Sequence, residues 1–434
     1  MVAGRSTEAL PFPQTTQRKP RLVEPAQCRS IAKPPRPCGL SDLKPASAGP
    51  GDSGTTMSGA IRLAYKLLVN DRAKFGALLM GITFAVFLMV EMTSMFAGVL
   101  NRASSMVANV GARIWVMDPA VNNAAGAIPL PDPVLDAVRS IDGVRFAVPL
   151  FSGSALVKLP GGGYQAVTVL GLDDSTLFGR PELIQGRIED IYAENGFIVV
   201  ADAEYGKLGR PGLGAEFEIN DHRAVVVGTA RAAIGGLFGV PTLYTTYARA
   251  IQYLPTARFT SAYVLVEPKD PAAIATIQRE VEHLGYVALT DDQFVRKISR
   301  FYTFQTGLGT NILLMTVISF IVGLSISGQT FYTFILENLE KFGALKAIGA
   351  KNRELVGMIL FQAGFTALTG YGLGVGLCVA AIGLARWRIP DYAALITPWN
   401  LALALVMVTV IAGVSSFIGV RKVLRIEPFD IFRG

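Results

Sequence analysis

The sequence predicts a membrane protein with four transmembrane α-helices and a large α+β extracytoplasmic domain inserted between helices one and two. Hydrophobic residues make up 51% of the 434 positions and charged residues only 17%, against about 25% charged in an ordinary soluble domain. Four apolar stretches are long enough to cross about 30 Å of hydrocarbon at 1.5 Å per helical residue. They are residues 77–100, 301–336, 355–385 and 397–420. The hydrophilic block between the first two, residues 101–300, is the predicted inserted domain.

Composition and motifs exclude several classes of function. The chain has only three cysteines and two histidines, which is too few for a disulfide framework or a histidine-rich zinc site. It contains no phosphate-binding loop, no H-E-x-x-H and no nucleophile elbow, so we expect no enzyme activity of its own, no bound cofactor and no bound metal. A net charge of +7 indicates basic loops facing anionic lipid, without a need for nucleic acid.

The first 56 residues are expected to be a disordered extension. They hold nine of the 24 prolines, eight Lys or Arg and no apolar run, so they cannot bury enough surface to offset the ordering entropy. Met57 opens a stretch typical of a natural start. The alternative is that these residues form a basic cytoplasmic arm.

Basic residues predict the orientation in the membrane. They gather before the first span, between the second and third, and after the fourth, and such clusters face the cytoplasm. The three groups are Arg62, Lys66, Arg72 and Lys74; Lys341, Lys346, Lys351 and Arg353; and Arg421, Lys422, Arg425 and Arg433. Both termini are therefore expected in the cytoplasm and residues 101–300 outside it.

These observations divide the chain into consecutive segments. After the extension, residues 57–112 form the cytoplasmic entry, first membrane helix and stalk, and 113–290 the outer domain. Residues 291–336 form a second stalk and membrane helix, 337–354 a cytoplasmic coupling helix, 355–385 and 397–420 the last two spans, and 421–434 a cytoplasmic tail. The uncharged run 301–336 would make about 54 Å of uninterrupted helix, and the first helix is expected to run on to Asn109, with Gly111 as its stop.

Short β-rich runs and two helical patterns predict a mixed domain, with two subdomains as one arrangement. The expected strands are Ile114 to Met117, Ala155 to Leu159, Ala166 to Leu170, Phe197 to Ala201 and Ala224 to Val227, and the expected helices are Pro133 to Ile141 and Ala272 to Leu284.

Small residues and one carboxylate stand out within the spans. Ladders four residues apart allow close helix contact, either within one subunit or at a dimer seam. Their members are Ser319 and Gly323, Gly370 and Gly374, and Gly372 and Gly376. Glu91 is the acidic residue of the first span, and such a carboxylate is a candidate functional group. About 25 Å from Lys74 along the helix, it is also expected near the outer interface, where water would simply solvate it.

The 337–354 loop has the pattern of a short amphipathic helix. Its apolar face consists of Leu339, Phe342, Leu345 and Ile348. Glu337 and Lys341 are spaced as an i,i+4 pair, and Gly349 is placed to end the helix. Such a helix either rests on lipid or docks into a partner protein, with Phe342, Leu345 and Ile348 filling a groove there.

Residues of this loop resemble the E-x-x-x-L-[RK]-A-I-G-A signature of the FtsX-like permease family, the membrane subunits of MacB-type ABC exporters. The closing segment 425–433, the entry from Ile61 to Lys74, and the outer segments 169–173 and 183–187 are similar as well. Lys351 departs from the family pattern, where a Ser or Thr often caps the next helix, and Asn352 is the expected substitute. The matching positions are Glu340, Gly343, Leu345, Lys346, Ala347, Ile348, Gly349 and Ala350.

The resemblance implies a multi-pass permease of the bacterial inner membrane that works as a homodimer or with a related permease. A separate cytoplasmic ABC ATPase would supply the energy for export or efflux. The implied coupling residues are Glu340, Lys341, Phe342, Gly343, Leu345, Lys346, Ile348 and Gly349. Similarity to the DevC branch implies a membrane-fusion adaptor. Two alternatives stay open: a subunit that signals to an outer partner such as a cell-wall hydrolase, and a lipoprotein-releasing permease.

Overall fold

Four helices of the described chain are long and apolar enough to cross a membrane. The structure, a computed structural model, describes residues 53–425 except 160, 237–238, 255–260 and 390. The expected disordered extension up to residue 52, and the closing motif after residue 425, lie outside the described residues. The four helices are α2 (Arg72–Ala103), α8 (Leu308–Glu337), α10 (Asn352–Arg388) and α11 (Pro398–Leu424). The predicted four-span organisation is confirmed.

A further helix, α1 (Ser53–Asn70), precedes the first span and packs along α10. It begins four residues before Met57, so the predicted boundary at residue 57 falls inside a helix. Asp71 separates α1 from α2, and its carboxylate accepts the backbone N–H of Lys74 at 3.3 Å as an N-cap.

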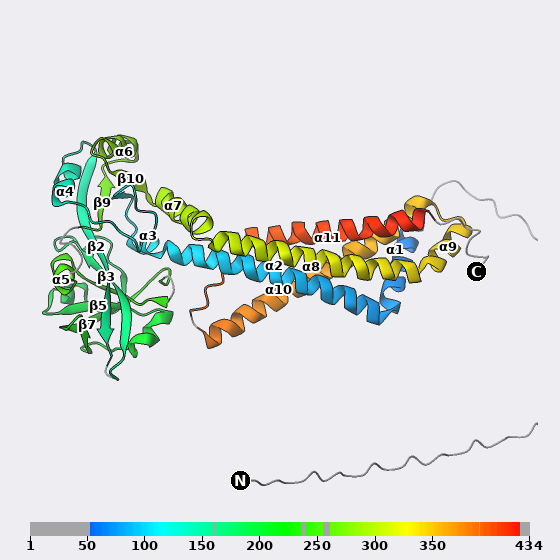
Figure 1. The fold of residues 1–434 in the computed structure, drawn as a ribbon, viewed down its shortest axis with the longest axis horizontal. Coiled ribbons are helices and arrows are strands. Elements are labelled where there is room, and N and C mark those ends of the chain that lie inside the picture. Colours follow the sequence, from blue (N-terminus) through cyan, green and yellow to red (C-terminus); the bar gives the residue numbers. More distant parts are fainter. Residues whose placement is uncertain (1–52, 160, 237–238, 255–260, 390, 426–434) are drawn as a thin grey trace, which may run out of the picture. The chain divides into compact units, whose positions relative to one another are not determined.

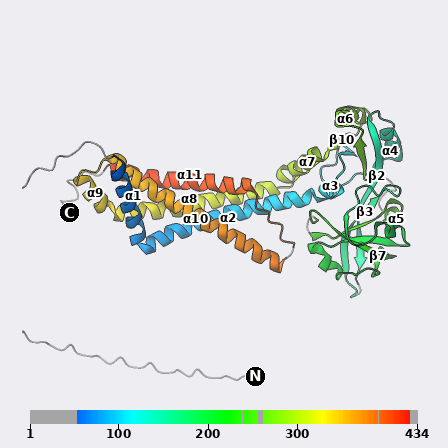
Figure 2. The same ribbon diagram turned by 180° about the vertical axis from the view of Figure 1, so that it is seen from behind.

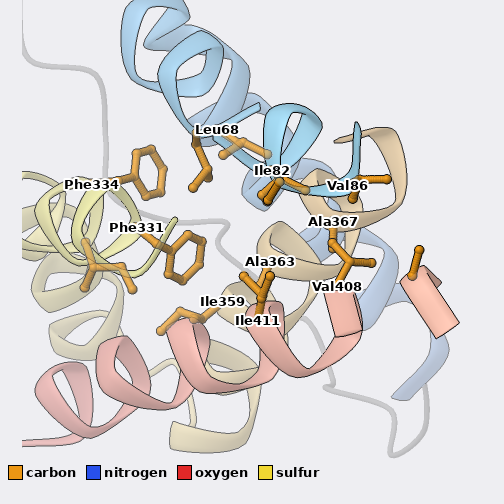
Figure 3. Close-up of a cluster of buried hydrophobic side chains, with 14 of the residues drawn as sticks. Leu68, Ile82, Val86, Phe331, Phe334, Ile359, Ala363, Ala367, Val408 and Ile411 are labelled. Atoms are coloured by element: carbon orange, nitrogen blue, oxygen red, sulfur yellow. The ribbon is translucent and has the colours of Figure 1, made fainter. Parts of the chain in front are cut away.

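The membrane helices form one bundle in which α2 packs along both α8 and α10, while α11 packs against α8 and α10 (Figure 1). Figure 3 shows side chains from α1, α2, α8, α10 and α11 meeting in a common apolar core. Its labelled members are Leu68, Ile82, Val86, Phe331, Phe334, Ile359, Ala363, Ala367, Val408 and Ile411.

The first stalk agrees with the prediction almost throughout. Helix α2 runs to Ala103, and α3 (Ser105–Val110) continues it after a single irregular residue, Ser104, whose hydroxyl donates back to the Asn101 carbonyl at 3.0 Å. Such back-bonding by serine loosens a helix locally. Gly111 then ends α3 in the left-handed conformation at φ +66°, as the sequence predicted.

The second stalk corrects a prediction, because residues 301–336 do not form one helix. Helix α7 (Asp291–Phe304) ends before Gln305, and α8 begins at Leu308. Gly307 lies between them with φ +73°, in the left-handed region that glycine adopts without strain. Two helices with a glycine joint therefore replace the expected rigid rod. Helices α3 and α7 connect the bundle to the domain inserted between α2 and α8 (Figures 1 and 2).

The inserted domain, residues 113–290, is built on a mixed sheet in the order β10-β1-β9-β2-β3-β8-β5-β7-β4, with β6 pairing beside β2 and β7. Each expected strand falls within an observed one or overlaps it, and both expected helices are present as α4 and α6. The strands are β1 (Ile114–Met117), β2 (Val144–Lys158), β3 (Tyr164–Leu172), β4 (Glu182–Gly186), β5 (Gly196–Val200), β6 (Glu216–Ile219), β7 (His222–Arg231), β8 (Thr242–Thr246), β9 (Tyr263–Pro268) and β10 (Val287–Thr290). The helices are α4 (Asp132–Arg139), α5 (Tyr247–Tyr253) and α6 (Ile274–His283), with short 3₁₀ turns η1 (Ile188–Tyr192), η2 (Ala203–Leu208) and η4 (Pro271–Ala273).

Strand β2 joins two halves of this domain. Its first residues pair with β9, and its residues from Phe151 onward pair with β3. One half packs α4 and α6 over the β1 and β9 region, while the other packs α5 against β2, β3 and β8. A third cluster lies between the sheet and the stalks, where Val107 of α3 and Phe294 of α7 are buried with Trp115 of β1. The stalks therefore share a core with the domain that they carry.

Candidate functional site

The loop between α8 and α10 carries the predicted short helix, α9 (Leu339–Ala347). The side chain of Asn338 marks the break from α8. It is buried, donates to the Phe334 carbonyl at 2.8 Å and accepts from Lys341 Nζ at 2.8 Å. These bonds fix where α9 leaves the direction of α8.

One side of α9 belongs to the chain's own core. Phe342 is 1% exposed within the membrane-helix core, and Leu339 and Leu345 pack against that core. The expectation that Phe342 fills a groove on a partner is therefore wrong, because the ring already packs inside this chain. Gly343 is buried beside it.

The other side of α9 is open. Ile348 has 86% of its surface exposed, far more than any other apolar member of the predicted face. Glu340 and Lys341 lie on the same helix and are both exposed, and Lys346 donates to the Leu424 carbonyl at 3.4 Å. The predicted face is thus divided, with Phe342 facing inward and Ile348 outward.

Gly349 ends α9 as the sequence predicted. Its φ is +105°, its N–H donates to the Lys346 carbonyl at 3.1 Å, and the next N–H, of Ala350, donates to the Leu345 carbonyl at 3.0 Å. These two hydrogen bonds around a left-handed residue form a Schellman motif. It holds Ile348 at a fixed place on the surface.

Helix α10 begins with a cap that the sequence did not indicate. Asn352 is the first helical residue and not the cap, since Lys351 occupies the cap position with extended backbone. The Lys351 N–H donates to the Glu354 carboxylate at 3.1 Å. Glu354, the third helical residue, therefore accepts the N–H of the cap residue, as the acidic residue of a capping box does.

Ion pairs near this loop differ from the predicted i,i+4 pair. Glu337 pairs with Lys74 on α2 instead of Lys341. Lys74 also contacts Asp71 at 2.7 Å, and its hydrogen bonds to that carboxyl hold the Asp71 pKa below its ordinary value. These contacts tie the end of α8 to the start of α2.

The small-residue ladders divide into packed and exposed faces. A Cβ on Gly374 would lie 2.7 Å from Val86 Cβ, and one on Gly370 would lie 2.6 Å from Ile82, so this ladder lets α2 approach α10. Gly323, buried like its ladder neighbour Ser319, faces Ala85 in the same way. On the other face of α10, a Cβ added to the exposed Gly372 or Gly376 would have no described atom within 4 Å. Only the first face explains packing within one subunit.

Glu91 is buried, not open to water as the simpler expectation held. It is 9% exposed, with Cys378 Sγ of α10 at 3.3 Å from Oε2 and the Tyr392 hydroxyl donating to Oε1. Tyr392 belongs to the loop that joins α10 and α11. Glu91 therefore helps hold that loop on α2.

Sequence reasoning missed a set of charged residues where this loop meets the inserted domain. Arg102, Glu204, Lys207 and Asp391 form two ion pairs there. The partners lie far apart in the chain, so no local pattern could have joined them. Among the described residues, no group of three or more His, Cys, Asp or Glu is placed to hold a metal ion.

Comparison with known proteins finds two family models that match consecutive segments of the chain. Residues 76–284 match the MacB-like periplasmic core domain, and residues 312–428 match the FtsX-like permease C-terminal family. An uncharacterized ABC transporter permease of Mycobacterium tuberculosis is 27% identical over 80% of this chain and 93% of its own length.

Two further similarities cover shorter segments. The macrolide export ATP-binding/permease protein MacB of Agrobacterium fabrum is 25% identical over 30% of this chain and 20% of its own length. The crystal structure of the periplasmic region of MacB from Actinobacillus actinomycetemcomitans aligns over 43% of this chain and 92% of that one, at 14% identity and a TM-score of 0.33.

Proposed function

The chain is an ABC transporter permease of the FtsX-like, MacB-type family, and from this premise we propose that it couples ATP hydrolysis in a separate ATPase to export outside the cytoplasm. The family implies a cytoplasmic ATPase partner. The 434 residues contain no phosphate-binding loop of their own. In the proposed mechanism the permease transmits motion and the ATPase hydrolyses ATP.

The exposed Ile348 at the end of α9 is the observation that carries this proposal. An isoleucine with 86% exposure, held by a Schellman motif on the same helix as the charged Glu340 and Lys341, has the form of an apolar anchor with a polar rim. The charged residues would then influence the association rate more than the final affinity. We propose that this side of α9 docks in the ATPase.

The inward side of α9 supplies a route for motion. Because Phe342 and Leu339 pack into the core shared by α8, α10 and α11, a displaced α9 would carry those helices with it. From there the displacement would reach the inserted domain through α3 and α7. The glycine joint at Gly307 gives the second stalk a place to bend.

Orientation and assembly complete the proposal. The basic clusters favour the 337–354 loop and both termini in the cytoplasm, with the inserted domain outside. The exposed Gly372 and Gly376 favour a close helix contact with a second permease, since glycine ladders allow backbones to approach. An adaptor would contact the inserted domain from outside.

The test is co-purification of the ATPase with Ile348→Asp. Burying an isoleucine contributes about 1.5 to 3 kcal/mol, so this variant should weaken the complex at least roughly tenfold while the chain still inserts. Ile348→Leu should retain the complex, and Leu284→Asp places the same charge on an exposed residue of the inserted domain as a control.

A helix that only rests on lipid predicts another result. Ile348→Asp would then bind membranes less tightly at that surface but keep the ATPase. Wild-type co-purification of the variant would remove the docking role of α9.

A further inference from the structure

One short turn of the inserted domain is held by two different parts of the membrane bundle. The turn is η2 (Ala203–Leu208), which follows β5. Glu204 faces Arg102, at the end of α2, with 3.1 Å between Arg102 Nη1 and Glu204 Oε1. Lys207 pairs with Asp391 of the α10–α11 loop.

The 3₁₀ geometry explains why both pairs point the same way. In a 3₁₀ helix, residues three apart eclipse one another. Glu204 and Lys207 have this spacing and opposite charges. One face of η2 therefore presents an acid to α2 and a base to the α10–α11 loop.

The Glu204 contact is deeply buried. Its side chain is fully buried, and that of Arg102 is 15% exposed. Desolvation and the neighbouring Asp202 raise the pKa of Glu204 to about 8. Breaking this contact would leave the largely buried Arg102 guanidinium without its Glu204 partner, which is costly in a site with little water.

The Lys207 contact needs a glycine beside it. Lys207 Nζ also donates to the Gly239 carbonyl at 2.6 Å. Gly239 has φ +66°, and a Cβ there would overlap the Lys207 ammonium and approach the Asp391 carboxylate. The backbone at Gly239 therefore lies so close to the ion pair that no side chain fits at this position.

The loop that carries Asp391 is itself fixed on α2. The Leu395 N–H donates to the Ser94 carbonyl at 2.8 Å, and any Cβ on Gly98 would overlap the Ala393 carbonyl. With the Tyr392 bond to Glu91, the loop is held at three places along α2. Because this loop is held on α2, Asp391 has a fixed position relative to the bundle.

We infer that η2 is the joint through which the α10–α11 loop and α2 move the inserted domain, with Lys207 and Asp391 as positioning residues. The inference rests on the proposed function, since it names where motion crosses from the bundle to the domain. Both stalks are helical connections of the chain itself, and one contains a glycine joint. A third, non-covalent attachment at η2 fixes the angle between the inserted domain and the membrane bundle, which the two stalks alone leave free.

The test measures ATP-driven movement in the complex of the full chain with its ATPase, reconstituted in nanodiscs. Spin labels at Tyr164→Cys in the inserted domain and Trp399→Cys at the start of α11 use two exposed positions. Their distance is measured without nucleotide and after trapping with ATP and vanadate. Lys207→Glu should abolish the ATP-dependent distance change while ATPase activity stays within about twofold of wild type.

Charge reversal separates positioning from general damage. Asp391→Lys should also abolish the change, and the double variant Lys207→Glu with Asp391→Lys should restore it. Lys158→Glu is the matched control, because Lys158 pairs with Glu218 at 2.9 Å wholly within the inserted domain. It should leave the distance change intact.

The outcomes distinguish the joint from the proposed function. A wild-type change that persists in Lys207→Glu, or a double variant that fails to recover, overturns the joint alone. A wild-type complex that hydrolyses ATP without any distance change overturns the transmission mechanism, and the joint with it.

Discussion

The two ends of the membrane bundle differ in whether the chain's own residues cover them. At the end that carries α9, an isoleucine is left 86% exposed near charged side chains. At the other end, the α10–α11 loop is fastened to α2 and its Asp391 is paired with Lys207. We propose that the end closed by its own chain transmits force within that chain, and that the open end receives the ATPase. Substitutions at each end test whether the two ends have these different roles.

The largest effect is expected for Gly98→Val, at the closed end. The new Cβ would overlap the backbone carbonyl of Ala393, and no rotamer relieves a backbone clash. The loop must therefore leave α2, at a cost of about 3 kcal/mol. The measurement is thermal unfolding of the purified chain. Gly76→Val, on the same helix but with no described atom near its Cβ, is the control, and equal unfolding temperatures would contradict the observed packing.

A smaller effect is expected from a matched pair on α10. Gly374→Leu should destabilise the chain by about 1 to 3 kcal/mol, because its side chain meets Val86 and the Thr83 carbonyl. Gly376→Leu should change the stability by less than about 0.5 kcal/mol, since that face is open. If Gly376 lies at a dimer seam, its variant should lose the dimer in a size measurement while the unfolding of the monomer is unchanged. Equal destabilisation by both variants would show that the two faces are not distinct.

Titration of Glu204 tests the closed end next. Its pKa is raised to about 8, so between the ordinary carboxyl pKa and about pH 8 the folded chain holds a proton that the unfolded chain has released. Stability should fall as pH rises through this interval. Glu204→Gln should flatten this part of the pH dependence of the unfolding temperature. A variant with the wild-type slope would assign the pH dependence to other groups.

The smallest effect is expected for Gly349→Val, at the open end. A β-branched residue at φ +105° is strained by about 1 kcal/mol, and no neighbouring atom adds a clash. The variant should fold and bind the ATPase, with reduced ATP-driven export. Gly349→Asn, which tolerates the left-handed region better, should lie between it and wild type. Wild-type export by the valine variant would contradict a role for the Gly349 turn in positioning Ile348.

Local sequence patterns predicted the elements well where the cause was local. The long apolar runs predicted the four spans, Gly111 predicted the end of the first stalk, and short β-rich runs predicted five of the described strands of the inserted domain. Gly307 shows the limit of composition. The run around it has no charge, yet its left-handed backbone divides the helix.

Tertiary context decided the remaining features of the site. Phe342 and Ile348 share the predicted apolar face, but only the packing of α9 against the bundle separates a core ring from an exposed anchor. Arg102 and Glu204 look like ordinary surface charges in the sequence, and their burial follows from contacts between distant segments. Hydrophobic periodicity in the sequence indicates which residues share a helix face but not what packs against that face.

The most direct test of the account is the accessibility of Ile348 with and without the ATPase. In a variant with its native cysteines replaced, Ile348→Cys should react rapidly with a thiol reagent in the permease alone and at least roughly tenfold more slowly in the complex. Tyr164→Cys, on the inserted domain and 67% exposed, should react equally in both samples. Equal reaction of Ile348→Cys with and without bound ATPase would contradict the claim that α9 is where the permease receives its motion.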